Sequence, residues 1–295
     1  QFPYVMSGVA QSLLAEEDEP QRKALTELRK CCYDSPWGRS TEGTLGELES
    51  ITFEDVIEHA KRHLRPNGAL IGVAGNVDAE AIRDCVEKQF ADWDSLPEPT
   101  VDRQATAQRS HHLTHESAQT HIALAFNAVP YGHPDYYTAW AAVNILSGGS
   151  SSRLFTEVRE KRGLCYSVYA TLNSLLLEGR VMAYAGTTTE RAQETLDVMI
   201  QEIQKLKDGI AADELARCHA RAKSALIMQQ ESTGARASSI ARDWFHLQRI
   251  NTLEDVRKAV EAVTVDQILD YVERYPAEHF TILTIGEKPL KLPTD

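Results

Sequence analysis

"ITFEDVIEHAKRHLRPNGALIGVAGN" (residues 51–76) and "VTVDQILDYVERYPAEHFTILTIGE" (residues 263–287) repeat one pattern, and this repeat decides the predicted fold. Each copy opens on a threonine suited to cap a helix, Thr52 or Thr264, with an acidic residue two positions later. Each then runs through a helical segment to a proline, a short apolar run typical of a buried strand, and a glycine. The pattern therefore predicts a helix–proline–strand–glycine unit that occurs twice.

The positions of the two units predict two domains of unequal length. Residues 96–110 are rich in proline and polar side chains and lack periodicity, which is typical of a linker. We therefore expect a first domain over residues 1–95 and a complete second domain over residues 111–295. Residues 111–262 precede the unit in the second domain, whereas residues 1–50 precede it in the first. If the domains are duplicates, the first copy lacks about 100 residues at its N-terminus.

The periodicity of the second domain predicts an α+β fold. The expected elements are, in order, a strand over 121–129, helices over 133–149 and 151–162, two strands around a turn at Glu178–Gly179, and long amphipathic helices over 189–207 and 211–229. Because strands and helices follow one another in this order, we expect two-layer domains, each a sheet covered by helices, and not a doubly wound parallel sheet.

The composition narrows the classes of partner. A balance of 42% apolar and 25% charged residues is that of a soluble globular protein. The formal net charge of -12 disfavours nucleic acid or an anionic membrane as the main partner, and no apolar run is long enough to span a membrane. The five cysteines include no C-x-x-C pair, so neither a disulfide framework nor a structural zinc site is expected. The compartment stays open between the cytoplasm and an organelle or the periplasm.

"SSRLFTEVREKRGLCYSVYA" (residues 151–170) carries the candidate site. A helix is expected to end at Gly163, with Arg159 near the edge of its apolar stripe and Tyr166 on the following strand, facing the same way as Val168 and Ala170. A guanidinium beside a phenol presents several donors, suited to carbonyl oxygens of a peptide or to a developing oxyanion. The same pattern is compatible with an arginine that stabilises a helix C-terminus and a half-buried tyrosine.

"LSGGSSSRLFTEVREKRGLCYSVYA" (residues 146–170) closely resembles the second-domain motif of the insulinase-type, or pitrilysin-type, zinc metallopeptidases, which include the mitochondrial processing peptidases. The resemblance extends through "SPWGRSTEGTLGELESITFEDVIEHAKRHLRPNGALIGVAGNVDAE" (residues 35–80). It implies duplicated α+β domains that enclose a peptide-binding chamber. It also implies that Arg159 and Tyr166 are substrate-binding residues that hold the peptide backbone across from the zinc.

The chain departs from this family at the zinc motif. The family binds zinc through H-x-x-E-H and a distant glutamate, and no H-x-x-E-H occurs in this sequence. We therefore expect no catalytic residue and no metal ligand in this chain, with zinc supplied by the intact enzyme or by a partner.

Two histidine groups resemble metal sites superficially. His59 and His63 lie one helical turn apart, but nothing implies a third ligand, so a solvated helix face is the interpretation we favour. The second group, "HHLTHE", contains His111, His112, His115 and Glu116. Its glutamate follows the second histidine, the reverse of their order in H-x-x-E-H, and the group lies where the linker meets a strand. We expect neither group to hold a metal.

Two functions remain open. The chain is either the substrate-binding portion or zinc-lacking subunit of an insulinase-type metallopeptidase, or a catalytically inactive homologue that serves as a scaffold or assembly protein. The expected partners are an unstructured peptide and a second chain in a homo- or hetero-dimer.

Overall fold

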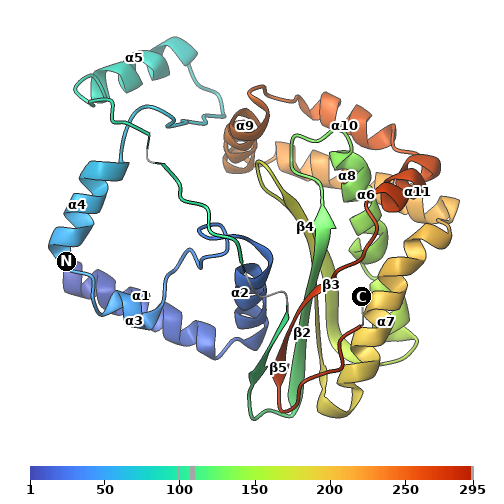
Figure 1. Ribbon diagram of the computed structural model, residues 1–295. Helices are drawn as coiled ribbons and strands as arrows, with labels where there is room; N and C mark the ends of the chain where they lie inside the picture. The colour runs from blue at the N-terminus through green and yellow to red at the C-terminus, as the bar shows by residue number, and fades with distance from the viewer. Residues whose placement is uncertain (99, 107–109, 294–295) are drawn as a thin grey trace.

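The computed structural model describes residues 1–98, 100–106 and 110–293, and a five-stranded sheet is the centre of that part of the chain (Figure 1). The spatial order of the strands is β1 (Ser110–Thr114), β5 (Thr281–Gly286), β2 (Gln119–Ala128), β4 (Gly179–Thr188) and β3 (Cys165–Ser174). Strand β1 runs parallel to β5, and the other neighbours are antiparallel. The β3–β4 hairpin turns over residues 175–178, which overlaps the expected turn at Glu178–Gly179, so the predicted strand pair is confirmed.

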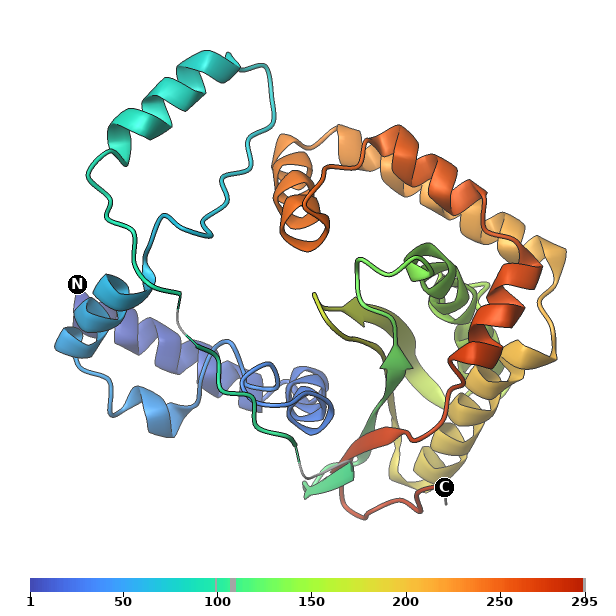
Figure 2. The ribbon, with the colours of Figure 1, turned by 45° about the horizontal axis from the view of Figure 1, so that its top comes forward.

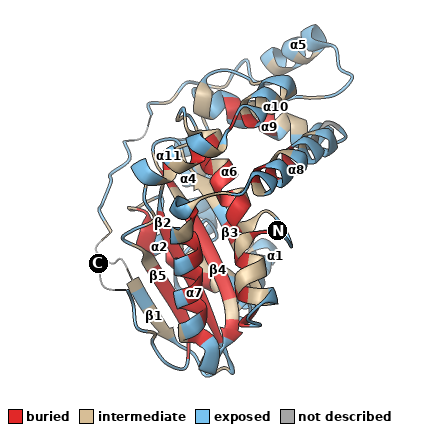
Figure 3. Cartoon of the chain, turned by 90° about the vertical axis from the view of Figure 1, so that its right-hand side faces the viewer, coloured by how far each residue is buried: buried red, intermediate tan, exposed pale blue. Residues whose placement is uncertain are grey.

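One face of the sheet is covered by helices of the C-terminal half. The helical elements of this half are η1 (Phe155–Glu160), η2 (Thr189–Arg191), η3 (Lys205–Asp208), α6 (Tyr136–Ser147), α7 (Ala192–Gln204), α8 (Ala212–Gln230), α9 (Thr233–Leu247), α10 (Leu253–Glu261) and α11 (Val265–Arg274). Side chains of β2 alternate, and Ile122, Leu124 and Phe126 pack into the cluster formed with these helices. Figure 3 shows the resulting burial along β2, β4 and β5. The fold is therefore α+β, with one sheet covered by helices.

Helix α2 (Pro20–Cys32) from the N-terminal half packs on the opposite face. In α2, buried residues recur at helical spacing, with Ala24, Leu28 and Cys31 on one stripe. This stripe contacts Ala123 and Ala125 of β2 and neighbouring residues of the sheet. Figure 2 shows α2 beside the strands. Since α2 is narrower than the sheet, part of this face is left for a pocket.

The other N-terminal helices are α1 (Phe2–Glu17), α3 (Leu45–Leu48), α4 (Phe53–His63) and α5 (Ala79–Gln89). Helix α4 begins at Thr52, whose side chain forms a capping box with Asp55. Helix α11 begins in the same way, with Thr264 and Gln267 forming its capping box. The helical half of the predicted repeat is therefore present in both copies.

The prediction of a strand after the helix is wrong for the first copy of the repeat. In the second copy α11 is followed by β5, which is hydrogen-bonded on both sides, to β1 and to β2. Residues 69–75 follow α4 without forming a strand, and their apolar side chains are largely exposed. A strand needs a neighbour to pair its backbone groups, and no described residue supplies one here. A duplicated first domain therefore stays a prediction, because one of its two local elements is missing.

The predicted linker lies partly against the N-terminal half. Gln104 and Ser35 exchange backbone hydrogen bonds, and Arg103 forms a 2.8 Å ion pair with Asp34. Residues 99 and 107–109 of this segment, like residues 294–295 of the predicted second domain, lie outside the described residues. The domain boundaries stay a prediction.

Candidate functional site

Arg159 lies on a wider turn of helix than the sequence predicts. Residues 151–162 were expected to form an α-helix, but Phe155–Glu160 is a π-helix, with the Lys161 backbone N–H donating to the Thr156 carbonyl at 2.9 Å. Leu154 and Val158 are fully buried, as expected of the apolar stripe. Single π turns inside helices occur frequently at functional sites, because the extra residue changes which side chains share a face.

Gly163 turns the chain from this helix into β3. Its φ is +58°, a left-handed conformation that glycine adopts at little cost. The Gly163 N–H donates to the Arg159 carbonyl at 3.0 Å, and the Leu164 N–H donates to the Val158 carbonyl at 3.0 Å. The guanidinium of Arg191 donates to the Gly163 carbonyl oxygen, which anchors the turn. The turn therefore fixes the direction in which the chain leaves the helix.

Tyr166 occupies an irregular position at the start of β3. Cys165 pairs with Thr187 and Ser167 pairs with Gly186, so Tyr166 has no partner in the β4 register. A bulge of this kind bends the strand and redirects a side chain. The Tyr166 residue is 85% exposed, while Val168 and Ala170 are buried against the helices. The expectation that these three residues face the same way is therefore wrong, because the bulge breaks the two-residue alternation.

The structure does bring Arg159 and Tyr166 together. The guanidinium carbon of Arg159 lies 5.1 Å from the Tyr166 ring centroid and 4.7 Å from the Phe155 ring centroid, so the cation stacks on two aromatic rings. Glu160 lies 3.8 Å from Arg159 Nε, and no described residue accepts a hydrogen bond from this guanidinium. Because 36% of the Arg159 side chain is exposed, its N–H groups are positioned but available.

A pocket of about 960 Å³ opens beside Tyr166, on the face of the sheet that α2 covers in part. Arg159 does not line this pocket itself, but stacks on Tyr166, which does. Tyr166 and Arg191 line it, as do residues 18–22 at the α1–α2 turn and the start of α2. His121 of β2 and Tyr184 of β4 line it from the sheet. The sequence analysis did not identify His121, although a histidine in an apolar run of alternating strand residues is a signal for a buried polar group.

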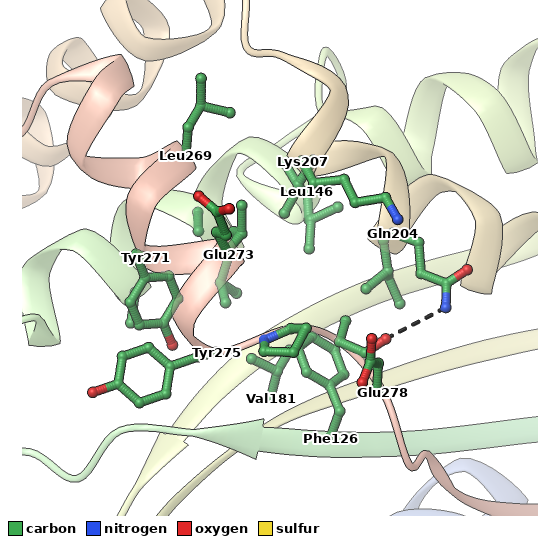
Figure 4. A pocket seen from close by; sticks show the side chains of 18 of the residues that line it. Phe126, Leu146, Val181, Gln204, Lys207, Leu269, Tyr271, Glu273, Tyr275 and Glu278 are labelled. Carbon is green, nitrogen blue, oxygen red and sulfur yellow. Dashed lines mark hydrogen bonds between the residues drawn. The ribbon is translucent and has the colours of Figure 1, made fainter. Parts of the chain in front are cut away.

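A second cavity, of about 500 Å³, lies on the opposite face of the sheet (Figure 4). Apolar side chains such as Phe126, Leu146 and Val181 form its walls, and Tyr275, which follows α11, lies beside them. None of the site residues expected from the sequence lies in this cavity. The pocket beside Arg159 and Tyr166 is therefore the candidate site.

The histidines that resembled metal ligands do not form a metal site in the described part of the chain. His59 and His63 stack on each other with ring centroids 4.3 Å apart on α4. His112 Nδ1 lies 2.8 Å from Thr284 Oγ1, which gives this ring a structural hydrogen bond. Across residues 1–98, 100–106 and 110–293, no three His, Cys, Asp or Glu side chains converge as metal ligands. These residues do not fit the zinc ion that the family resemblance implies.

The comparison with protein families matches residues 50–221 to the model described as the Peptidase M16 inactive domain. This match covers more than half of the chain. The chain belongs to this family. The resemblance to the insulinase-type peptidases is therefore confirmed.

Other M16-like proteins agree with this assignment. The chain is 28% identical over 278 residues to the uncharacterized zinc protease YmxG of Bacillus subtilis, covering 92% of this chain and 66% of the relative. It is 26% identical over 269 residues to an uncharacterized zinc protease of Mycobacterium bovis, covering 88% of this chain and 61% of the relative. The chain thus spans less than two thirds of the length of these two relatives.

Solved structures share the M16 fold. A crystal structure of a peptidase M16 inactive domain from Pseudomonas fluorescens gives a TM-score of 0.86 at 21% identity, covering 99% of this chain and 71% of that one. A chain of complex III from Candida albicans gives a TM-score of 0.81 at 19% identity, covering 96% and 70%. No helix in the described residues of this M16 chain is long and apolar enough to cross a membrane.

Proposed function

We propose that this chain is the substrate-binding portion, or the zinc-lacking subunit, of an insulinase-type metallopeptidase. The observation that carries the proposal is the Arg159 guanidinium stacked on Tyr166, which lines an open pocket. An extended peptide exposes carbonyl oxygens that lack intramolecular partners, and both of these side chains carry donors. Arg159 and Tyr166 bind such a peptide and orient it.

Peptide hydrolysis requires groups that the described residues do not supply. In this family zinc activates water for attack on the scissile amide, but no step is assigned to this chain because its described residues offer no ligand set. The role of this chain is then to hold the peptide in a fixed orientation, which lowers the entropic part of the barrier for a catalytic partner. The proposal includes a dimer between this chain and a zinc-containing chain.

A scaffold role is the second candidate. The absence of a metal-ligand cluster from the described residues favours it, as does the fold shared with a chain of complex III. The two roles differ in one measurable property. A substrate-binding chain binds an unstructured peptide in the pocket, whereas a scaffold binds its assembly partner and leaves the peptide free.

The test is fluorescence anisotropy with a labelled unstructured peptide of mixed sequence, titrated with the purified chain. Saturable binding that unlabelled peptide displaces supports the substrate-binding role. If no binding occurs up to high micromolar protein, while the chain is folded by circular dichroism, the substrate-binding role fails and the scaffold role remains.

The first prediction concerns metal content. After purification and dialysis, the chain is expected to contain far less than one zinc ion per molecule, and to leave an unstructured peptide intact in the absence of a partner, because the described residues provide no zinc ligand set. Elemental analysis and mass spectrometry of the incubated peptide check both points. Stoichiometric zinc that survives dialysis would contradict this prediction.

A further inference from the structure

His121 lies in a row of residues that crosses the sheet beneath the pocket. It is paired with Gly186 of β4, and Gly186 is paired with Ser167 of β3, the residue after Tyr166. Neighbouring strands are about 4.8 Å apart, so His121 lies roughly 10 Å from the start of β3. The His121 residue is 5% exposed and lines the pocket. It is therefore a polar side chain in the floor of the pocket that Tyr166 borders.

Gly186 keeps the space between His121 and β3 open. A side chain at this position would begin 3.0 Å from the Tyr184 hydroxyl oxygen, closer than ordinary contact allows. The Tyr184 hydroxyl instead reaches His121 Nδ1 at 2.7 Å. The floor of the pocket is thus formed by an imidazole and a phenol that hydrogen-bond to each other over a glycine.

The hydrogen bond between these two rings defines the tautomer of His121. Burial raises the pKa of Tyr184 and lowers the pKa of His121, so both rings are neutral near pH 7. Among the described residues, the acceptor within reach of the buried Tyr184 O–H is His121 Nδ1. If Nδ1 carried the proton instead, the hydroxyl hydrogen would have no partner, which is costly in a buried site. Tyr184 therefore donates to Nδ1, and the proton of the neutral imidazole is on Nε2.

The described residues, 1–98, 100–106 and 110–293, hydrogen-bond the His121 side chain at Nδ1 and not at Nε2. We infer that His121 is a further substrate-contacting residue, whose Nε2–H donates to a backbone carbonyl oxygen of a peptide bound in this pocket. A neutral donor in a buried floor suits a neutral acceptor, because burying a carboxylate there without a cation costs more. This inference rests on the proposed function. It adds a contact on β2, which β4 separates from Tyr166 on β3.

The test is peptide affinity for the double variant His121→Phe/Tyr184→Phe. Both replacements keep an aromatic ring of similar size, and together they leave no buried polar group without its partner. Loss of one neutral hydrogen bond is expected to weaken peptide binding about three- to tenfold. The matched control is His112→Phe/Thr284→Val, which removes a similar 2.8 Å hydrogen bond from the same sheet outside the pocket. That control is expected to bind peptide like the unaltered chain.

A second readout does not depend on affinity. In ¹⁵N NMR of the free, unaltered chain, the His121 ring is expected to be the Nε2–H tautomer, and its Nε2 resonance should shift when peptide is added. An Nδ1–H tautomer would overturn the inference.

The affinity measurements distinguish failure of this inference from failure of the proposed function. Unchanged affinity in a folded His121→Phe/Tyr184→Phe variant, when the unaltered chain binds, would overturn the inference and leave the Arg159–Tyr166 proposal standing. Absence of binding by the unaltered chain would overturn both.

Discussion

Arg153→Ala is expected to lower the free energy of unfolding by about 3 kcal/mol, because it removes one partner of a largely buried ion pair. Arg153 Nε and Nη2 lie 2.7 and 2.8 Å from the two Glu214 carboxylate oxygens. The same guanidinium donates to the Gly209 carbonyl at 2.7 Å and to the Lys205 carbonyl at 3.3 Å. The side chains of the pair are 15% and 17% exposed, so the variant would leave a carboxylate that water reaches poorly. Urea unfolding followed by circular dichroism measures the loss.

Arg217→Ala on α8 is the matched control. Arg217 pairs with Asp213 one helical turn away, but both side chains are exposed, and such pairs contribute about 0.5 kcal/mol or less. Equal destabilisation by the two variants would contradict the structural role of Arg153. Arg153 lies in the motif that carries the family resemblance. A larger loss of stability in Arg153→Ala than in Arg217→Ala would show that Arg153 holds the segment before η1 against α8.

The same pair makes stability depend on pH. The hydrogen bonds from Arg153 hold the pKa of Glu214 below its ordinary value, despite the opposing effect of burial. A carboxyl group with a lowered folded-state pKa contributes stability above its unfolded-state pKa, and that contribution is lost as the pH falls through the folded-state value. The stability difference between the unaltered chain and Arg153→Ala should therefore shrink in acid.

Arg159→Ala is expected to weaken peptide binding tenfold to hundredfold while leaving the thermal midpoint nearly unchanged. A charge-assisted hydrogen bond to a peptide carbonyl contributes about 1.5 to 3 kcal/mol. The partly exposed Arg159 guanidinium makes no hydrogen bond to the described residues that its loss would leave unpaired. Tyr166→Phe removes one neutral hydroxyl and should cost less, about 0.5 to 1.5 kcal/mol. Fluorescence anisotropy for each variant, beside its thermal midpoint, measures both effects.

Arg162→Ala is the control for this pair. Arg162 is close in sequence, but its guanidinium donates to the carbonyl and the carboxylate of Glu157, at 2.7 and 2.8 Å. Its replacement should leave peptide affinity unchanged. If Arg159→Ala instead unfolds the chain, and affinity per folded molecule stays constant, the stacked pair is structural and does not bind peptide.

Features set by nearby residues could be predicted from the sequence. The capping threonines Thr52 and Thr264 identified the starts of α4 and α11, and the turn at Glu178–Gly179 identified the β3–β4 hairpin. These predictions hold because a cap or a tight turn is determined within a few residues.

Features that depend on distant partners could not be predicted in this way. The apolar run at residues 69–75 looks like β5, but it has no strand to pair with among the described residues. The bulge at Tyr166 depends on the register with β4. His121 becomes a candidate site residue once β4 places Tyr184 beside it and Gly186 in the same row. The register of pairing between strands decides all three.

Photo-crosslinking tests the central claim that a peptide lies beside Arg159 and Tyr166. An unstructured peptide carrying a benzophenone would be irradiated with the chain, with and without excess unlabelled peptide, and the adducts mapped by mass spectrometry. The account predicts competable adducts within residues 163–167 and 186–188 or at Arg191, which line the pocket. Competable adducts confined to residues 206–208, 271–273 and 275–278, which line the cavity on the opposite face of the sheet, would contradict it.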